Sequence, residues 1–162
     1  MTTTITREQF VTTMGSVCTP VSIVATYGED GAPSGSTVSA FLSLSADPPM
    51  ILVSLSRTSR VLNVIQRAGG FSVNVLGSQA KELAITFASK ADDRFEHVDW
   101  SHTPHGPRLN LASSWVGCEL LESTAGGDHV ILQGLIRAAH QGDSNPLIYH
   151  NRSFGTFSQL HP

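Results

Sequence analysis

The stretch that decides the fold is GSTVSAFLSLSADPPMILVSLSRTS, residues 35–59. It contains two apolar runs, which we expect to be strands joined by a tight turn, and it leads directly into a helical pattern. Because side chains alternate along a strand, Thr37 and Ser39 share one face of the first run, as Ser54 and Ser56 do in the second. The apolar side chains between them point the other way. Each run therefore has one face for a core and one face of hydroxyl groups.

The second run ends at a predicted helix start. Arg57, Thr58 and Ser59 directly precede an apolar pattern of helical spacing, which we expect to continue to Ala68 and to stop at the glycine pair that follows. Hydroxyl groups and free backbone N–H groups at a helix N-terminus suit a phosphate. Our hypothesis from this stretch is that it holds a phosphorylated cofactor.

Length and composition set the broad class. The chain has 162 residues, so we expect one domain over residues 1–162, long enough for a sizeable core. Only 14% of residues are charged and the formal net charge is −3, with no basic stripe, which argues against a nucleic-acid partner. No apolar run is long enough for a membrane span, and the first ten residues lack the pattern of a signal peptide. We therefore expect a cytoplasmic protein.

The cysteines and histidines give no metal pattern. Cys18 and Cys118 are far apart and fit no metal or redox spacing, so we expect buried thiols, with a single disulfide as the alternative. His97, His102 and His105 cluster in one segment, but their spacing matches no helical ligand pair and no cysteine is near. The sequence therefore predicts no metal site.

The remaining elements follow from periodicity and turn signals. Further helices are expected at residues 6–14 and 78–89, and further strands at 20–27, 71–76, 114–123, 129–140 and 146–149. Pro48 and Pro49 are expected to prevent ladder pairing at the corner between the first two runs, and residues 92–108 to form a long polar loop. This order favours a mainly antiparallel β-barrel with helices packed outside. A Rossmann fold is disfavoured because no glycine-rich fingerprint follows a first strand.

An ordered set of segments resembles the short-chain flavin reductases, the reductase components of two-component flavin-dependent monooxygenases. The segments are GSTVSAF (35–41), DPP (47–49), LVSL (52–55), FSVNVL (71–76), FA (87–88), DRF (93–95), GDH (127–129) and PLIYH (146–150). The resemblance implies a split β-barrel of the FMN-binding type, mainly β with flanking helices and a Greek-key core. It also implies a homodimer with flavin near the subunit interface. The implied reaction is NAD(P)H-dependent reduction of free FMN or FAD, which then diffuses to a partner monooxygenase.

The resemblance also implies a set of site residues. The first wall of the flavin site would be Ser36, Thr37, Val38 and Ser39, continued by Ser54, Leu55 and Ser56. The phosphate would be taken by Ser59 and the helix start, with Ala88, Lys90 and Arg94 nearby. The nicotinamide would face the turn Gly127-Asp128-His129, with Tyr149 and Arg152 closing the site.

The predicted catalytic residue is His129, which would orient the nicotinamide or donate to the developing charge. Hydride transfer is cofactor chemistry that needs no nucleophile or metal, in keeping with the lack of either pattern. NADH is favoured over NADPH because no arginine pair stands near Gly127. This chain departs from the family pattern at Thr37-Val38-Ser39, where many members have Thr-Ala-Asn. Serine is shorter than asparagine, so whether Ser39 reaches the flavin stays open.

Alternatives remain at this stage. A non-catalytic flavin carrier would use the same barrel, and so would an FMN oxidase of the pyridoxamine-phosphate type, although that class would want more cationic phosphate ligands. A plain interaction module would leave the serine-lined strand faces as solvated surface. Individual site residues also have a purely structural explanation. Ser59 would then be a helix cap, His129 a turn residue, and Arg94 the ion-pair partner of Asp92 or Asp93.

Overall fold

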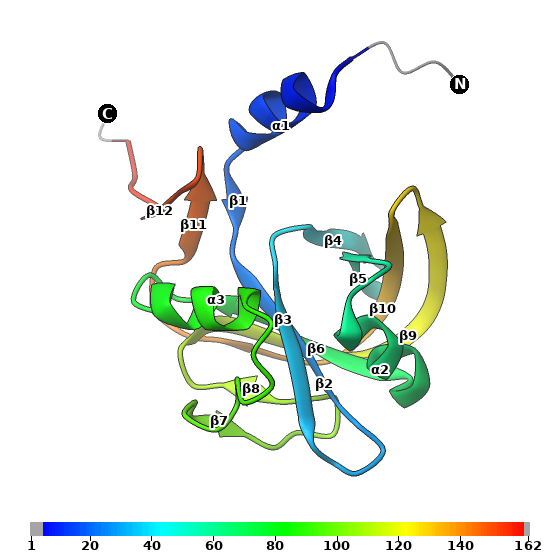
Figure 1. The fold of residues 1–162 in the computed structure, drawn as a ribbon. Coiled ribbons are helices and arrows are strands. Elements are labelled where there is room, and N and C mark those ends of the chain that lie inside the picture. Colours follow the sequence, from blue (N-terminus) through cyan, green and yellow to red (C-terminus); the bar gives the residue numbers. More distant parts are fainter. Residues whose placement is uncertain (1–4, 161–162) are drawn as a thin grey trace.

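The computed structural model describes residues 5–160 and builds them around a seven-stranded antiparallel sheet. Its strands, in sheet order, are β3 (Pro33–Val38), β2 (Ser22–Tyr27), β6 (Gly70–Leu76), β9 (Ala112–Gly126), β10 (His129–Gln141), β5 (Pro49–Ser56) and β4 (Phe41–Ala46). Because β3 and β4 are consecutive in the chain but lie at opposite ends of this order, the sheet curls back on itself (Figure 1). The mainly β architecture with antiparallel pairing is confirmed.

Two helices pack against this sheet. They are α2 (Arg60–Ala68) and α3 (Lys81–Ala88), which flank β2 and β3 in Figure 1. The apolar stripe of α2 is buried, as the 3.6-residue period predicts: Val61, Leu62 and Ile65 are at most 3% exposed. Burying a side chain of this kind contributes about 2 kcal/mol. The helix ends where expected, at Gly69, whose φ of 70° favours glycine.

The core divides into two clusters. One lies between α2 and strands β5, β6, β9 and β10, and the other lies under α3 and includes Ile23, Leu76 and Phe87. Along β5 the side chains of Ile51, Val53 and Leu55 are buried while those between them remain accessible, so the predicted alternation is confirmed. The core thus holds β5 from one side and leaves its other side free.

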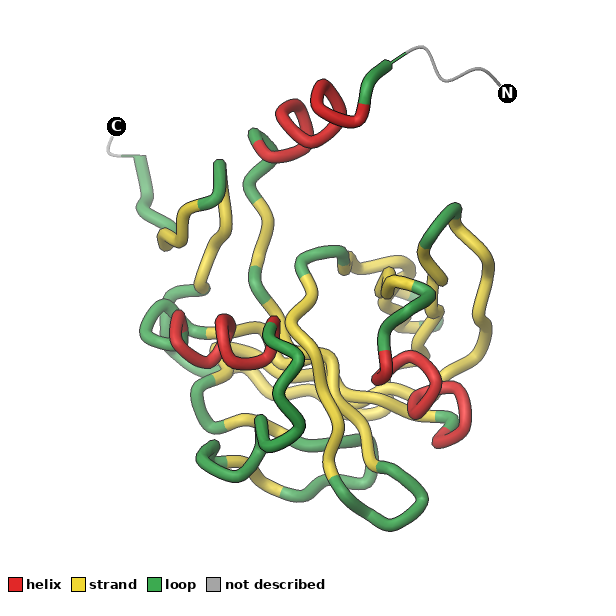
Figure 2. The backbone as a smooth tube through the Cα atoms, in the orientation of Figure 1, coloured by secondary structure: helices red, strands yellow, loops and turns green. Residues whose placement is uncertain are grey.

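A smaller sheet and a projecting helix complete the chain. The sheet pairs β1 (Thr19–Pro20), β11 (Leu147–His150) and β12 (Ser153–Thr156). The helix α1 (Arg7–Gly15) begins with the predicted capping box, in which Thr6 Oγ1 accepts from the backbone N–H of Gln9 at 3.1 Å. Figure 2 shows α1 standing away from the main sheet, and none of its residues is buried.

Two expectations about the strands are wrong in detail. Residues 35–59 contain parts of three strands rather than two, because the chain breaks at Ser39-Ala40 and β4 then forms a hairpin with β5. Pro49 does take part in the ladder, opposite Ala46, since the first residue of a strand need not donate a hydrogen bond. The peptide bond between Asp47 and Pro48 in this hairpin turn is cis.

The polar segment after α3 is more ordered than expected. It contains the short paired strands β7 (Trp100–Ser101) and β8 (Arg108–Leu109). The buried side chain of Asn74 holds it, donating to Pro107 O at 3.1 Å and accepting from Leu109 N at 2.8 Å. Within residues 5–160, each helix is too short or too polar to serve as a membrane span.

Candidate functional site

A hollow of about 250 Å³, here called the inner hollow, lies between β3, β5 and the turn that joins β9 to β10. It is lined by Ser36, Thr37, Val38, Ser39, Ala40, Ser54, Leu55, Ser56, Ser59 and His129. These include every residue that the sequence placed along the two hydroxyl-bearing runs, together with His129. Segments that are up to 93 residues apart in sequence therefore meet at one place, as expected.

Strand pairing explains why His129 lies beside the serines. In the register between β10 and β5, His129 is opposite Ser56 and Ile131 is opposite Ser54. The turn before β10 is set by Gly127, whose φ is 67°. Because this turn and the end of β5 lie at the same edge of the sheet, the imidazole is delivered to the end of the serine-bearing strand.

A second hollow of about 520 Å³, the outer hollow, continues from the first and shares Ser36, Ser56 and Ser59 with it. Its remaining lining comes from the start of β3, the start of α2 and the segment after α3: Pro33, Ser34, Gly35, Thr58, Arg60, Val61, Lys90, Ala91, Asp92, Arg94 and Phe95. The predicted phosphate-side residues Lys90 and Arg94 thus line the same continuous depression as the predicted ring-side residues.

The first turn of α2 offers free donors at the junction of the two hollows. Ser59 is the N-cap residue, but its side chain makes no capping hydrogen bond, and its own N–H donates to Ser56 O at 2.9 Å. The N–H groups of the first helical residues have no acceptor within the helix. This helix end, with the hydroxyls of Ser56 and Thr58 beside it, is suited to bind a phosphate.

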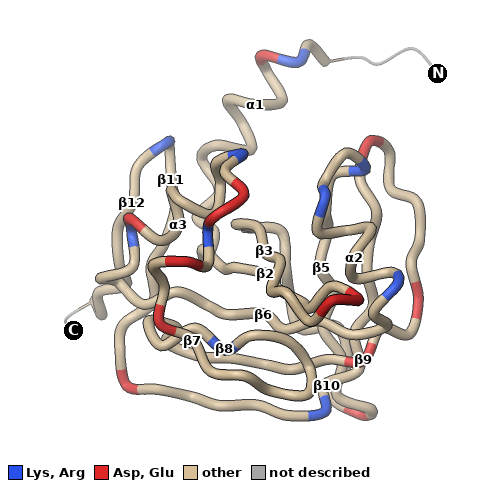
Figure 3. Tube along the Cα trace, turned by 60° about the horizontal axis from the view of Figure 1, so that its bottom comes forward, with Lys and Arg blue, Asp and Glu red and all other residues tan. Residues whose placement is uncertain are grey.

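Three cationic side chains surround the outer hollow. Arg60 pairs through Nη1 with Asp92 and donates from Nη2 to Lys90 O at 2.8 Å, which ties the start of α2 to the segment after α3. Arg94 donates from Nη1 to Gly35 O at 2.6 Å. Burial lowers the pKa of Arg94 from its ordinary value, and the positive charge of Arg60 lowers it further. Figure 3 shows that Lys and Arg are otherwise scattered along the trace among acidic residues.

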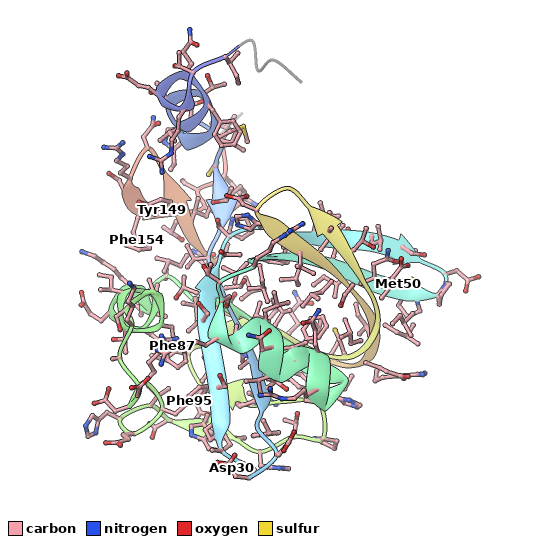
Figure 4. The ribbon with its side chains drawn as sticks, turned by 45° about the vertical axis from the view of Figure 1, so that its right-hand side comes forward. Asp30, Met50, Phe87, Phe95, Tyr149 and Phe154 are labelled. Carbon is pink, nitrogen blue, oxygen red and sulfur yellow. The ribbon has the colours of Figure 1, made fainter. Side chains whose placement is uncertain are left out.

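Gly35 is needed for this arrangement. A Cβ there would lie 3.1 Å from a ring carbon of Phe87 and 3.2 Å from one of Phe95, both closer than most side chains allow. The rings of Phe87 and Phe95 pack edge to face at 4.8 Å beside β3 (Figure 4). Glycine lets the backbone approach this aromatic pair while its carbonyl oxygen receives Arg94.

Asp128 lines neither hollow, but it holds the histidine that does. Its Oδ1 lies 2.8 Å from Nδ1 of His129, and its backbone oxygen accepts from Arg57 N at 3.0 Å. The hydrogen bond and charge of His129 lower the pKa of the Asp128 carboxyl. With Nδ1 engaged in this way, Nε2 is the ring nitrogen left to a ligand.

Three predicted residues lie elsewhere. Ala88 is exposed at the end of α3 and lines neither hollow. Tyr149 packs against Phe154, with ring centroids 5.1 Å apart, and Figure 4 shows the pair on the small sheet, away from Phe95. Arg152 is exposed in the turn between β11 and β12, with φ of 62°. Within one chain, the expectation that Tyr149 and Arg152 close the site is therefore not met.

Sequence reasoning missed Arg60, Asp92 and Phe95 as lining residues. Arg60 could have been found, because it is the first residue after the helix cap at which a phosphate was expected. The tie between Arg60 and Asp92 joins residues 32 positions apart and has no local signature. Within residues 5–160, no group of three or more His, Cys, Asp or Glu side chains could hold a metal ion. Cys18 and Cys118 are free thiols, so a disulfide does not join them, and only Cys118 is buried as expected.

The lining of the two hollows is suited to bind a flat polar ring with a phosphorylated tail. The inner hollow presents short hydroxyl side chains and strand backbone to a ring, with an imidazole at one end. The junction presents helix N–H donors and cations to an anion. A buried Nε of Arg94 has no partner among residues 5–160, so an acceptor is expected there. These features fit a flavin nucleotide.

Comparison with known proteins agrees with this geometry. Residues 14–158 match the family described as Flavin reductase like domain. The chain is 37% identical over 151 residues, 93% of this chain and 81% of the relative, to the reductase component of 4-nitrophenol 4-monooxygenase/4-nitrocatechol 2-monooxygenase of Rhodococcus opacus. It is 36% identical over 152 residues, 91% of this chain and 80% of the relative, to the flavin reductase (NADH) of Kitasatospora aureofaciens.

A solved structure shares the fold. The structure of nitrilotriacetate monooxygenase component B from Mycobacterium thermoresistibile superimposes with a TM-score of 0.91 at 26% identity, covering 96% of this chain and 90% of its own. Together with the family match over most of the chain, the fold and the hydroxyl-lined hollows lead to one conclusion: this chain belongs to the family of flavin reductase like domains.

Proposed function

We propose that this protein is an NAD(P)H:flavin oxidoreductase that reduces free flavin and supplies it to a partner monooxygenase. The observation that carries the proposal is the continuous depression formed by the inner and outer hollows. One part is bounded by hydroxyl side chains and His129, and the other contains an uncapped helix N-terminus flanked by cations. No nucleophile or metal is needed, because the reaction is a hydride transfer between two cofactors.

Each part of the depression has a role in this reaction. When bound, the flavin supplies the electrophilic ring that accepts a hydride from the nicotinamide. The segments 36–39 and 54–56 hold the ring with backbone groups and hydroxyls, and the start of α2 with Ser59 holds the phosphate. His129, oriented by Asp128, lies at the open side and positions the nicotinamide or donates to charge that develops on the ring. The protein mainly brings two rings to within about 3–3.5 Å of each other.

NADH is the proposed reductant, with NADPH as the alternative. The turn that would face the nicotinamide carries the carboxylate of Asp128, and this carboxylate disfavours an additional phosphate nearby. Arg57 is the arginine whose backbone contacts that turn. A single arginine is less than the arginine pair that would recognise a 2′-phosphate, in keeping with the expectation that NADH is favoured.

The seven-stranded sheet is proposed to be the split β-barrel with Greek-key core of this family, acting as a homodimer. The chain exposes 10037 Å², whereas a compact monomer of 17.3 kDa exposes about 7,800 Å². Full exposure of the six residues outside the described range would explain at most about 1,000 Å² of the difference, at roughly 160 Å² per residue. The excess of exposed area that is still unexplained exceeds the roughly 800 Å² that each subunit buries in an interface of standard size.

The helix α1 is the proposed dimer contact. Phe10, Val11 and Met14 share one face of α1 by helical spacing, and each is exposed. A second copy that covers this face would also be the source of Tyr149 and Arg152 for the site, because these residues do not reach it within one chain. Two free thiols and the use of NADH are consistent with the proposed cytoplasmic location.

A steady-state panel tests the proposed function. Purified protein is mixed with NADH or NADPH and with FMN or FAD in air, and nicotinamide oxidation is followed by absorbance. We expect oxidation that depends on added flavin and is faster with NADH. Flavin binding without turnover would instead support a carrier, and no oxidation with any pair would refute the proposal.

A further inference from the structure

The two hollows adjoin and are lined differently, which gives a bound molecule a direction. His129 lines only the inner hollow, and Lys90, Arg94 and Phe95 line only the outer hollow. Ser36, Ser56 and Ser59 line both. If the ring occupies the inner hollow, the chain of atoms that leaves it reaches the start of α2 at this junction.

The outer hollow is larger than a mononucleotide needs. FMN ends at its phosphate, for which the N–H groups at the junction are sufficient. The outer hollow, which includes the junction, has a volume of about 520 Å³, roughly twice that of the inner hollow. Its lining includes Pro33 and the half-buried ring of Phe95, an apolar surface of the kind against which a purine can pack.

Two cationic side chains of the outer hollow, Lys90 and Arg94, still have donor groups available to a ligand. Arg60 is committed to Asp92 and to the carbonyl oxygen of Lys90. The Lys90 ammonium forms no ion pair among residues 5–160, and Arg94 has a buried Nε without a partner. Burial lowers the pKa of Arg94, which means that the surroundings disfavour its charged form. An anion bound beside Arg94 would offset this unfavourable effect.

We propose that the flavin taken by this protein is the dinucleotide FAD in preference to FMN. The outer hollow is its adenylate subsite, in which Lys90 and Arg94 bind the second phosphate. The inference rests on the proposed function, since it names the flavin that the same site holds. The tie between Arg60 and Asp92 fixes the segment that carries Lys90 and Arg94, so the subsite is already formed by the chain.

Equilibrium binding without nicotinamide tests the inference. The dissociation constants for FAD and FMN are measured by quenching of flavin fluorescence with the wild-type protein and with Lys90→Gln. Because charge-assisted hydrogen bonds to the second phosphate are available only to FAD, we expect FAD to bind at least about tenfold more tightly than FMN. Lys90→Gln should weaken FAD about fivefold and leave FMN within about twofold. Lys81→Gln removes a charge from the start of α3, outside both hollows, and should change neither constant.

The outcomes separate this inference from the proposed function. Equal affinities for the two flavins, or tighter binding of FMN, would overturn the FAD assignment while leaving the reductase intact. An equal loss of both flavins in Lys90→Gln would also overturn it, since Lys90 would then serve the first phosphate. If neither flavin binds the wild-type protein, the proposed function itself fails.

Discussion

The Nδ1 atom of His129 lies 2.8 Å from Oδ1 of Asp128, at the turn that delivers the imidazole to the inner hollow. The hydrogen bond and the charge of His129 lower the pKa of the Asp128 carboxyl below its ordinary value. Because the folded-state pKa is depressed, the ionised carboxylate stabilises the fold above about pH 4. That contribution is lost as the pH falls through the lowered pKa.

Replacing His129 with alanine should raise the pKa of Asp128 back toward about 4. The measurement is an acid titration of the Asp128 carboxyl carbon by NMR in the two proteins. His140→Ala changes an exposed histidine at the far end of β10 and serves as the control, in which Asp128 should titrate as in the wild type. An unchanged midpoint in His129→Ala would show that the pair does not form in solution.

Replacing Ser59 with aspartate should weaken flavin binding about tenfold or more, because it puts a like charge beside the phosphate at the start of α2. The Ser59 side chain makes no capping hydrogen bond, so the helix itself should lose little stability. Gln66→Glu adds the same charge to the exposed part of α2 near its other end and should leave binding within about twofold. Fluorescence titration compares the three proteins, and equal affinities would remove Ser59 from the site.

Gly134 in β10 should not tolerate a side chain. A Cβ there would lie 2.6 Å from Cζ of Phe71 and 3.0 Å from Cβ of Cys118, both fully buried. Gly134→Ala should therefore lower the free energy of unfolding by about 1–3 kcal/mol through overpacking. Gly155→Ala is the matched control, because nothing lies within 4 Å of its added Cβ. Urea unfolding measures both, and equal stabilities would contradict the packing described for β10.

Replacing Phe10 with aspartate should dissociate the proposed dimer, because it places a charge in the apolar face of α1. Thr12→Asp adds the same charge on the opposite face of that helix and should leave the dimer intact. Sedimentation velocity at micromolar concentration distinguishes the two states. A wild-type protein that sediments as a monomer would refute the dimer, and a dimeric Phe10→Asp would exclude α1 as its contact.

The elements that the sequence predicts well are those whose pattern is local. The period-2 alternation of β5, the 3.6-residue stripe of α2 and the αL glycine at its end all follow from neighbouring residues, and the structure has each of them. The part of the inner hollow that Ser54, Ser56 and Ser59 form follows from these elements, whereas His129 lies there because β10 pairs with β5.

The features that could not be predicted depend on contacts between distant segments. The buried amide of Asn74 holds Pro107 and Leu109, which are 33 and 35 positions away, and a pattern of local propensities cannot reveal such a contact. Whether Pro49 pairs depends on which strand lies beside it. The positions of Tyr149 and Arg152 depend on the path of the chain after β10. The sequence of the short turns there does not predict the direction in which the chain continues.

Strand β5 serves two functions at once, since Ile51 and Val53 fix it in the interior while its end, Ser54 to Ser56, lines the inner hollow. A change in packing on the interior side would therefore also displace residues that line the hollow. Efforts to redesign what this enzyme accepts should therefore spare β5 and vary the exposed side chains of Lys90 and Ala91, which line the outer hollow and not the inner one.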